Sequence, residues 1–180
     1  MPDLSLFKSP APYHIISYGT LLGTEFFQTF VGGIVSYQAL PRAGFSQLQQ
    51  KLMPVYFSLQ TALPAVLALT YPGSKILGLQ SGLQGVLADR WGALVPVTTI
   101  FITGLANWAY FGPATTRVMR ERKHQETKDG KKYHDPGPHS TKMQQLNSSF
   151  NTMHSLSALL NLAGYVSTCF YGFSLASRIQ

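Results

Sequence analysis

The sequence predicts an all-α integral membrane protein, a four-helix bundle with a long polar loop between spans 3 and 4, forming one transmembrane domain over residues 1–180. Three observations predict this fold. Charged residues make up 12% of the chain, about half the share that is usual in soluble domains. Four apolar runs are each long enough to cross a bilayer, which takes about 20 residues. The polar block 117–142 holds twelve of the charged residues and separates the third run from the fourth.

The first expected span covers about 13–40. It contains Gly19 and Gly23, and small residues four positions apart let a neighbouring helix approach closely. Pro41 and Arg42 should end the span, because proline disfavours helix in the residue before it and arginine marks the headgroup region.

The link 43–52 carries apolar side chains at helical spacing, so we expect it to lie in the membrane interface. The second span, about 53–71, has Pro54 at its start, where the missing N–H costs little. Pro64 lies near its middle, where a kink is expected. Residues 76–89 alternate leucine with glycine, glutamine and serine, which is typical of an interfacial connection or a short amphipathic helix.

The third span, about 91–116, is bounded by aromatic residues of the kind that collect at membrane surfaces. The block 117–142 should be a flexible basic loop outside the membrane, entered by a helical projection of residues 114–126. Residues 127–140 are rich in Gly, Pro and charge, which predicts disorder and makes the loop histidines solvated side chains rather than metal ligands. The fourth helix should run from about Thr141 to Ala176, with its span at about 150–176.

The net charge of +7 arises largely in the block 117–142. Basic residues beside apolar spans favour anionic lipid or a protein partner over nucleic acid, which we exclude. The excess of Lys and Arg in the first and third loops predicts that these loops are cytosolic and that both termini lie outside. The single cysteine, Cys169, permits no internal disulfide and is expected to be a small packing residue.

Polar side chains inside the spans should face other helices, because the bilayer core offers no water to satisfy them. At a rise of about 1.5 Å per residue, several of them reach similar depths from different spans. His14 and His154 are expected near opposite membrane surfaces, which argues against a shared haem or metal site. The expected intramembrane polar cluster comprises Glu25, Gln28, Gln60, Asn107, His154 and Asn161.

Glu25 is the only charged residue between Lys8 and Arg42. An acid at this depth is costly unless it is neutral or paired, and such residues often mark ion or proton paths. The alternative interpretation is a protonated carboxyl that donates a hydrogen bond to an Asn or Gln of a neighbouring helix. The spans contain no Lys or Arg to pair with it.

Several short motifs occur in order along nearly the whole chain and resemble the transmembrane protein 205 family. Its position for Glu25 holds a neutral Gln in the animal pattern, so the resemblance argues against an obligatory acid. The resemblance implies a small four-span helical protein without an agreed substrate. The motif residues are Thr29-Phe30, Gly33, Leu40-Pro41-Arg42, Phe45, Lys51-Leu52, Pro54, Tyr56-Phe57, Asn107, Pro113-Ala114-Thr115-Thr116, Met119, Glu121, Asn151, His154, Leu156-Ser157 and Leu160-Asn161-Leu162.

The sequence holds no catalytic triad, metal-ligand spacing or phosphate-binding glycine loop, so we expect neither an enzyme nor a cofactor. Our first hypothesis is a multi-pass protein that acts in membrane organisation, trafficking or as a scaffold. The alternative is a small transporter or carrier, coupled to an ion, proton or metal, that uses the polar cluster and works as an oligomer. We expect an endomembrane location, the endoplasmic reticulum or a related membrane, with a mitochondrial membrane as the alternative.

Overall fold

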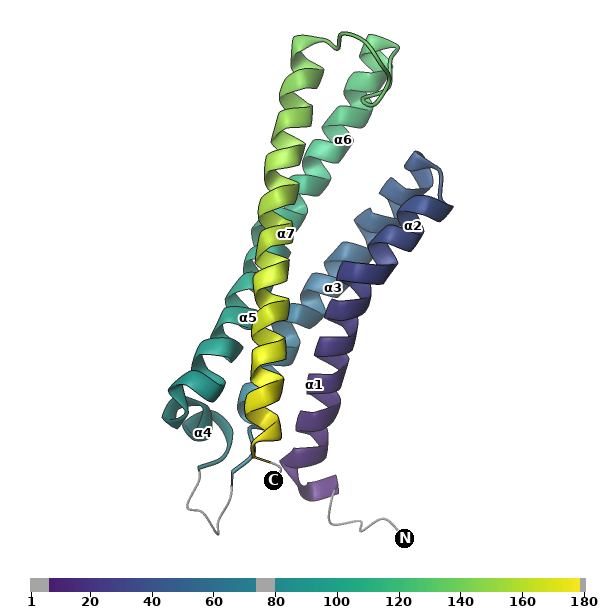
Figure 1. Ribbon diagram of the computed structural model, residues 1–180. Helices are drawn as coiled ribbons and strands as arrows, with labels where there is room; N and C mark the ends of the chain where they lie inside the picture. Colours follow the sequence, from purple (N-terminus) through teal and green to yellow (C-terminus); the bar gives the residue numbers. More distant parts are fainter. Residues whose placement is uncertain (1–6, 74–79, 179–180) are drawn as a thin grey trace.

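The computed structural model describes residues 7–73 and 80–178, and within these ranges every regular element is a helix (Figure 1). The all-α prediction is therefore confirmed. Three short segments, labelled η, are π-helical, with the wider turn that an extra residue produces. The elements are α1 (Pro10–Phe26), η2 (Phe27–Gly32), α2 (Gly33–Ala39), α3 (Arg42–Leu69), α4 (Gly82–Ala88), η3 (Arg90–Leu94), α5 (Val95–Ala106), η4 (Asn107–Phe111), α6 (Gly112–Asp129) and α7 (Thr141–Ala176).

The elements join into four long rods: α1 to α2, α3, η3 to α6, and α7. α5 packs against α3 and α7, while α1 packs against the same two helices. Both ends of the described chain and α4 lie at one end of the molecule, and the turns after α2 and α6 point to the other (Figure 1).

Three helices are long and apolar enough to cross a membrane: Arg42–Leu69, Arg90–Asp129 and Thr141–Ala176. They cover residues 53–69 of the second expected span and all of the third and fourth, and they indicate a membrane protein. The rod from Pro10 to Ala39 is not one of the three, so a bundle with four crossings stays a prediction.

The first rod ends where the sequence predicts, because Leu40 is extended, with φ −108° and ψ 143°. Arg42 then begins α3, and its guanidinium lies 4.5 Å from the centre of the Tyr37 ring. The link 43–52 is helical, as its spacing predicts, and forms the first turns of α3 rather than a separate segment. Gly44 lies in the first turn, and residues 45–53 contain no Gly or Pro, so one helix continues without interruption.

The helical projection predicted over 114–126 is confirmed, and α6 continues three residues further, to Asp129, so the flexible loop predicted over 117–142 is wrong for this part. Gly130 ends α6 with a left-handed φ of +62°, a conformation that glycine adopts at little cost. α7 begins at Thr141, as predicted, and the Ser140 hydroxyl accepts a hydrogen bond from the Met143 N–H. Only the short stretch 130–140 connects the two helices.

Glycine does allow a close approach of two helices, but not at the predicted positions. A methyl group on Gly19 or Gly23 would meet nothing within 4 Å, so no described neighbour packs there. A methyl on Gly104 of α5 would lie 2.7 Å from the backbone oxygen of Gln60. The bare backbone of Gly104 is what lets α3 and α5 approach beside the polar residues described next.

Candidate functional site: a buried polar network

Polar side chains from three rods form a hydrogen-bonded network between the helices. The Gln60 amide nitrogen donates to Glu25 Oε1 at 3.0 Å and to Asn161 Oδ1 at 2.9 Å. The Tyr56 hydroxyl donates to the same Asn161 oxygen at 2.6 Å, and Asn161 Nδ2 donates to Thr29 Oγ1 at 2.8 Å. The network thus joins α1 and η2 to α3 and α7.

The side chains at the centre of the network are buried. Glu25 is fully buried and Gln60 is 3% exposed. Among the described atoms, Glu25 Oε2 and Gln60 Oε1 have no hydrogen-bond partner. A buried polar atom without a partner costs about 1–3 kcal/mol, so each of these two oxygens destabilises the folded site.

Local backbone features place these side chains. Glu25 lies two residues before the π-helical segment η2, which carries Thr29, and a second such segment, η4, begins at Asn107. π-helical segments are frequent at functional sites because they redirect side chains within a helix. Gly164 of α7 leaves room for Thr103, whose hydroxyl would lie 2.9 Å from a methyl at that position.

The structure brings together Glu25, Gln60 and Asn161 of the expected cluster. Asn107 is fully buried but donates to the backbone oxygen of Ser157 at 3.2 Å, which places it beside the network rather than in it.

His154 is not part of the cluster. It is exposed and stacks on Phe150, with ring centres 5.5 Å apart, and it lies seven residues, or about 10 Å along α7, from Asn161 on the same helix face. Gln28 is half-buried and forms no hydrogen bond with the network in the described part of the chain.

Tyr56 and Thr29 belong to the network although we did not select them as cluster residues. Each lies four positions from a predicted member, Tyr56 from Gln60 and Thr29 from Glu25. Residues four apart share a helix face, so this spacing is the signal that could have found them.

A second polar group lies near the end that holds both termini. His14 is buried between the Thr70 hydroxyl, 3.0 Å from Nδ1, and the Tyr171 hydroxyl, 2.7 Å from Nε2. This histidine therefore packs between helices. Among the residues that the structure describes, no group of three or more His, Cys, Asp or Glu could hold a metal ion.

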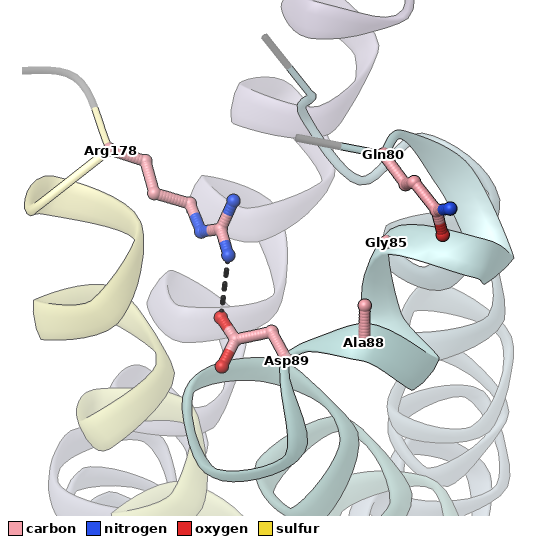
Figure 2. Close-up of a pocket in the computed structure, with 5 residues that line it drawn as sticks. All are labelled: Gln80, Gly85, Ala88, Asp89 and Arg178. Atoms are coloured by element: carbon pink, nitrogen blue, oxygen red, sulfur yellow. Dashed lines mark hydrogen bonds and ion pairs between the residues drawn. The ribbon is translucent and has the colours of Figure 1, made fainter. Parts of the chain in front are cut away.

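Beside this group, Asp89 links Arg178, after the end of α7, to the start of η3. Asp89 Oδ2 accepts hydrogen bonds from the Tyr71 hydroxyl and from Arg178, both at 2.7 Å, and its Oδ1 accepts from the Gly92 N–H at 2.9 Å. Figure 2 shows the ion pair at the edge of a pocket of about 280 Å³. The pocket is lined by Gln80, Gly85, Ala88, Asp89 and Arg178.

The Asp89 contacts should make the free energy of unfolding depend on pH in the acid range. Burial raises the pKa of this carboxyl, but the hydrogen bonds from Tyr71, Arg178 and Gly92 outweigh it and bring the pKa below its ordinary value of 3.8. A lowered pKa stabilises the fold above the ordinary value, and this stabilisation is lost as the pH falls through the lowered pKa. Asp89→Asn should therefore reduce the free energy of unfolding near neutral pH, and the difference from wild type should shrink below about pH 4.

The measurement is unfolding followed by circular dichroism in detergent at a series of pH values. Lys8→Gln, which changes an exposed charge at the same end, is the control and should leave the pH profile unchanged. If the free energies of unfolding of wild type and Asp89→Asn differed by the same amount at every pH, the ionised Asp89 carboxylate would not be the source of the pH dependence.

Comparison with known proteins places the chain in a family. Residues 16–124 match the family described as domain of unknown function (DUF4149). The chain belongs to the DUF4149 family. The matched range holds Glu25, Gln60 and Asn107 but ends before α7 and Asn161.

A curated relative extends over most of this DUF4149 protein. It is 36% identical over 168 residues, which cover 93% of this chain and 90% of the relative. The relative is "Xanthocillin biosynthesis cluster protein D" from Aspergillus fumigatus. No solved structure matches the chain.

The motif residues of the DUF4149 chain lie both in the network, as Thr29, Tyr56 and Asn161 do, and outside it. Pro41 precedes the first residue of α3, and Pro113 stands in the first turn of α6. Lys51 is exposed on α3. Thr115 has a buried hydroxyl oxygen without a hydrogen-bond partner among the described residues.

Proposed function

We propose that the protein is a non-enzymatic multi-pass membrane protein that acts as a scaffold in membrane organisation or trafficking, by holding a basic helical extension against an anionic surface. The observation that carries the proposal is the pair α6 and α7, which continue past the turn between α2 and α3 (Figure 1). The motif resemblance to the transmembrane protein 205 family supports the same architecture. We assign it to an endomembrane, with a mitochondrial membrane as the alternative.

Four membrane crossings are part of the proposal. The rod from Pro10 to Ala39 is about 45 Å long at about 1.5 Å per residue, which exceeds the hydrocarbon thickness of about 30 Å. Large exposed apolar side chains line this rod, as expected for contact with lipid. They are Ile15, Ile16, Phe26, Phe27, Phe30, Ile34 and Val35.

The far end of the extension carries exposed basic side chains that form no ion pair within the described ranges. Lys128, Lys132 and Lys142 are exposed, and none forms an ion pair within the described ranges. Lys128 stands about 16 Å along α6 from Arg117. This distance exceeds the Debye length of about 8 Å at physiological salt, so these charges are screened from the protein's own membrane and are available to another surface.

The test is binding of the protein, reconstituted in nanodiscs of neutral lipid, to two probes: vesicles containing phosphatidylserine, and polyglutamate as an acidic polypeptide. Each Lys near an anionic surface contributes about 1 kcal/mol. The triple variant Lys128→Gln, Lys132→Gln and Lys142→Gln should therefore bind its probe about 100-fold more weakly. The probe that wild type prefers distinguishes a lipid surface from a protein partner.

The control variant changes three exposed basic residues elsewhere, Lys8, Lys51 and Arg90, to Gln. It should bind like wild type. Absence of binding to both probes, or an equal loss in the two triple variants, would contradict the proposal.

The relative named for a xanthocillin biosynthesis cluster suggests that the partner of such a scaffold is a biosynthetic protein at the membrane. The unpaired Glu25 oxygen favours a second candidate function, a small proton- or ion-coupled carrier that works as an oligomer. In liposomes, Glu25→Gln should abolish pH-coupled flux, and unchanged flux would remove Glu25 as the coupling residue.

A further inference from the structure

The direction of the hydrogen bonds in the buried network is consistent from one end to the other. Gln60 turns its NH₂ group toward Glu25 and Asn161, and Asn161 turns its own NH₂ group toward Thr29. Tyr56 supplies the second donor to the Asn161 oxygen. In this arrangement Glu25 is an acceptor only, which suits an ionised carboxylate.

A protonated Glu25 does not fit this donor-to-acceptor direction of the hydrogen bonds. On Oε1 the new O–H would face the Gln60 NH₂ group, so that two donors would meet. On Oε2 it would have no partner in the present arrangement, and the Thr168 hydroxyl beside Glu25 donates instead to the Gly164 backbone oxygen. A buried hydroxyl without an acceptor costs about 1–3 kcal/mol.

Rotating the two amide groups by half a turn removes the contact between two donors, and it places the Gln60 NH₂ group where the Gln60 oxygen stood, a position without a hydrogen-bond partner among the described atoms. The rotation exchanges the oxygen and the nitrogen of Gln60 and of Asn161 and leaves the other heavy atoms where they are. Glu25 then donates to the Gln60 oxygen, which also accepts from the Asn161 NH₂ group. The Asn161 NH₂ group also donates to the Tyr56 oxygen, and the Thr29 hydroxyl donates to the Asn161 oxygen. All four contacts keep one donor and one acceptor.

We propose that Glu25 is a proton-binding site, and that loading it with one proton from water reverses the direction of every hydrogen bond from Glu25 to Thr29. The only covalent bond that forms is the O–H bond on Glu25. The reversal carries the protonation state from α1, through α3 and α7, to η2, and it frees the Tyr56 O–H to donate elsewhere. The switch needs no transport and no basic extension, so it is independent of both functions proposed above.

The surroundings make Glu25 the group that titrates. The titratable side chains near it are Tyr18 on its own helix, Tyr56 on α3, and Tyr165 with Cys169 on α7. From α5 the nearby side chain is Thr103, which does not titrate. All four titratable neighbours are uncharged at neutral pH. No Lys, Arg or His in the described ranges forms an ion pair with Glu25, so a proton is what neutralises its charge.

The experiment is a pH titration of the side-chain amide signals in ¹⁵N NMR spectra of protein labelled at Gln and Asn and held in bicelles. The two signals are assigned by their loss in Gln60→Met and Asn161→Leu. In wild type, the Gln60 and Asn161 signals should shift together with one midpoint. Signals of the exposed residues Gln84 and Gln144 should not follow that midpoint.

Glu25→Gln provides the sharpest variant, because its amide is neutral, has nearly the same shape and can donate to the Gln60 oxygen. Its Gln60 and Asn161 signals should stay at the low-pH wild-type positions at every pH. Thr29→Val is a second variant that keeps Glu25: the Gln60 shift should persist while the Asn161 shift is reduced. Signals that do not shift at any pH at which wild type stays folded, that shift with different midpoints, or that still titrate in Glu25→Gln would overturn the proposal.

Discussion

Gly104→Ala should destabilise the packed helices by about 2 kcal/mol, because overpacking of this kind costs about 1–3 kcal/mol. The added methyl would lie 2.7 Å and 2.9 Å from the backbone oxygen and carbon of Gln60. Backbone atoms cannot move aside as the end of a side chain can, so α3 and α5 must separate. The separation should also pull Gln60 away from Glu25 and Asn161. The measurement is unfolding in mixed micelles with increasing SDS, followed by circular dichroism.

Gly19→Ala is the matched control, since its methyl would meet nothing within 4 Å. Alanine favours helix over glycine by up to about 1 kcal/mol, so this variant should be as stable as wild type or more stable. If Gly104→Ala proved as stable as Gly19→Ala, the close approach of α3 and α5 would be wrong.

Arg122→Ala should loosen the packing of residues 130–140, which connect α6 and α7. The Arg122 guanidinium lies 3.7 Å from the centre of the Tyr133 ring and 4.5 Å from that of Phe150. Contacts of this type contribute about 0.5–2 kcal/mol each. Together they hold residues 130–140 against both helices, so their loss should make amide hydrogen exchange in this stretch at least about 5-fold faster.

Arg120→Ala is the control for that experiment, because Arg120 is exposed on the same helix. Exchange in this variant should match wild type. Glu126 accepts hydrogen bonds from the Tyr133 N–H and from Lys123, so some protection should remain in Arg122→Ala near Tyr133. Equal exchange in the two variants would show that the rings do not fasten the connection.

The order of this connection could not be predicted from its composition. Gly, Pro and charged residues predict disorder when each is considered alone, whereas the order depends on contacts of Arg122 with Phe150, which is 28 positions away. The basic residues of the block were identified, but not which of them stay free. Lys128 is exposed, while Arg122 is buried between two rings.

The buried network was more accessible to prediction, because depth follows directly from position in a helix. Depth arithmetic selected Glu25, Gln60 and Asn161, which lie together in the structure. Including His154 was wrong, and its expected place near a membrane surface, about two turns from Asn161, already argued against it. The π-helical segments η2 and η4 were not predicted either, because an extra residue in a helical turn leaves no periodic signal in a single sequence.

The central structural claim is that the first rod crosses the membrane together with the three that are long and apolar enough to do so. The most direct measurement uses single cysteines at Lys8, Pro136 and Ser177, three exposed positions, in a Cys169→Ala background. Sealed vesicles are treated with a membrane-impermeant maleimide before and after permeabilisation. Four crossings predict that Lys8→Cys and Ser177→Cys react from one side and Pro136→Cys from the other. Reaction of Lys8→Cys from the same side as Pro136→Cys would mean three crossings and would contradict the account.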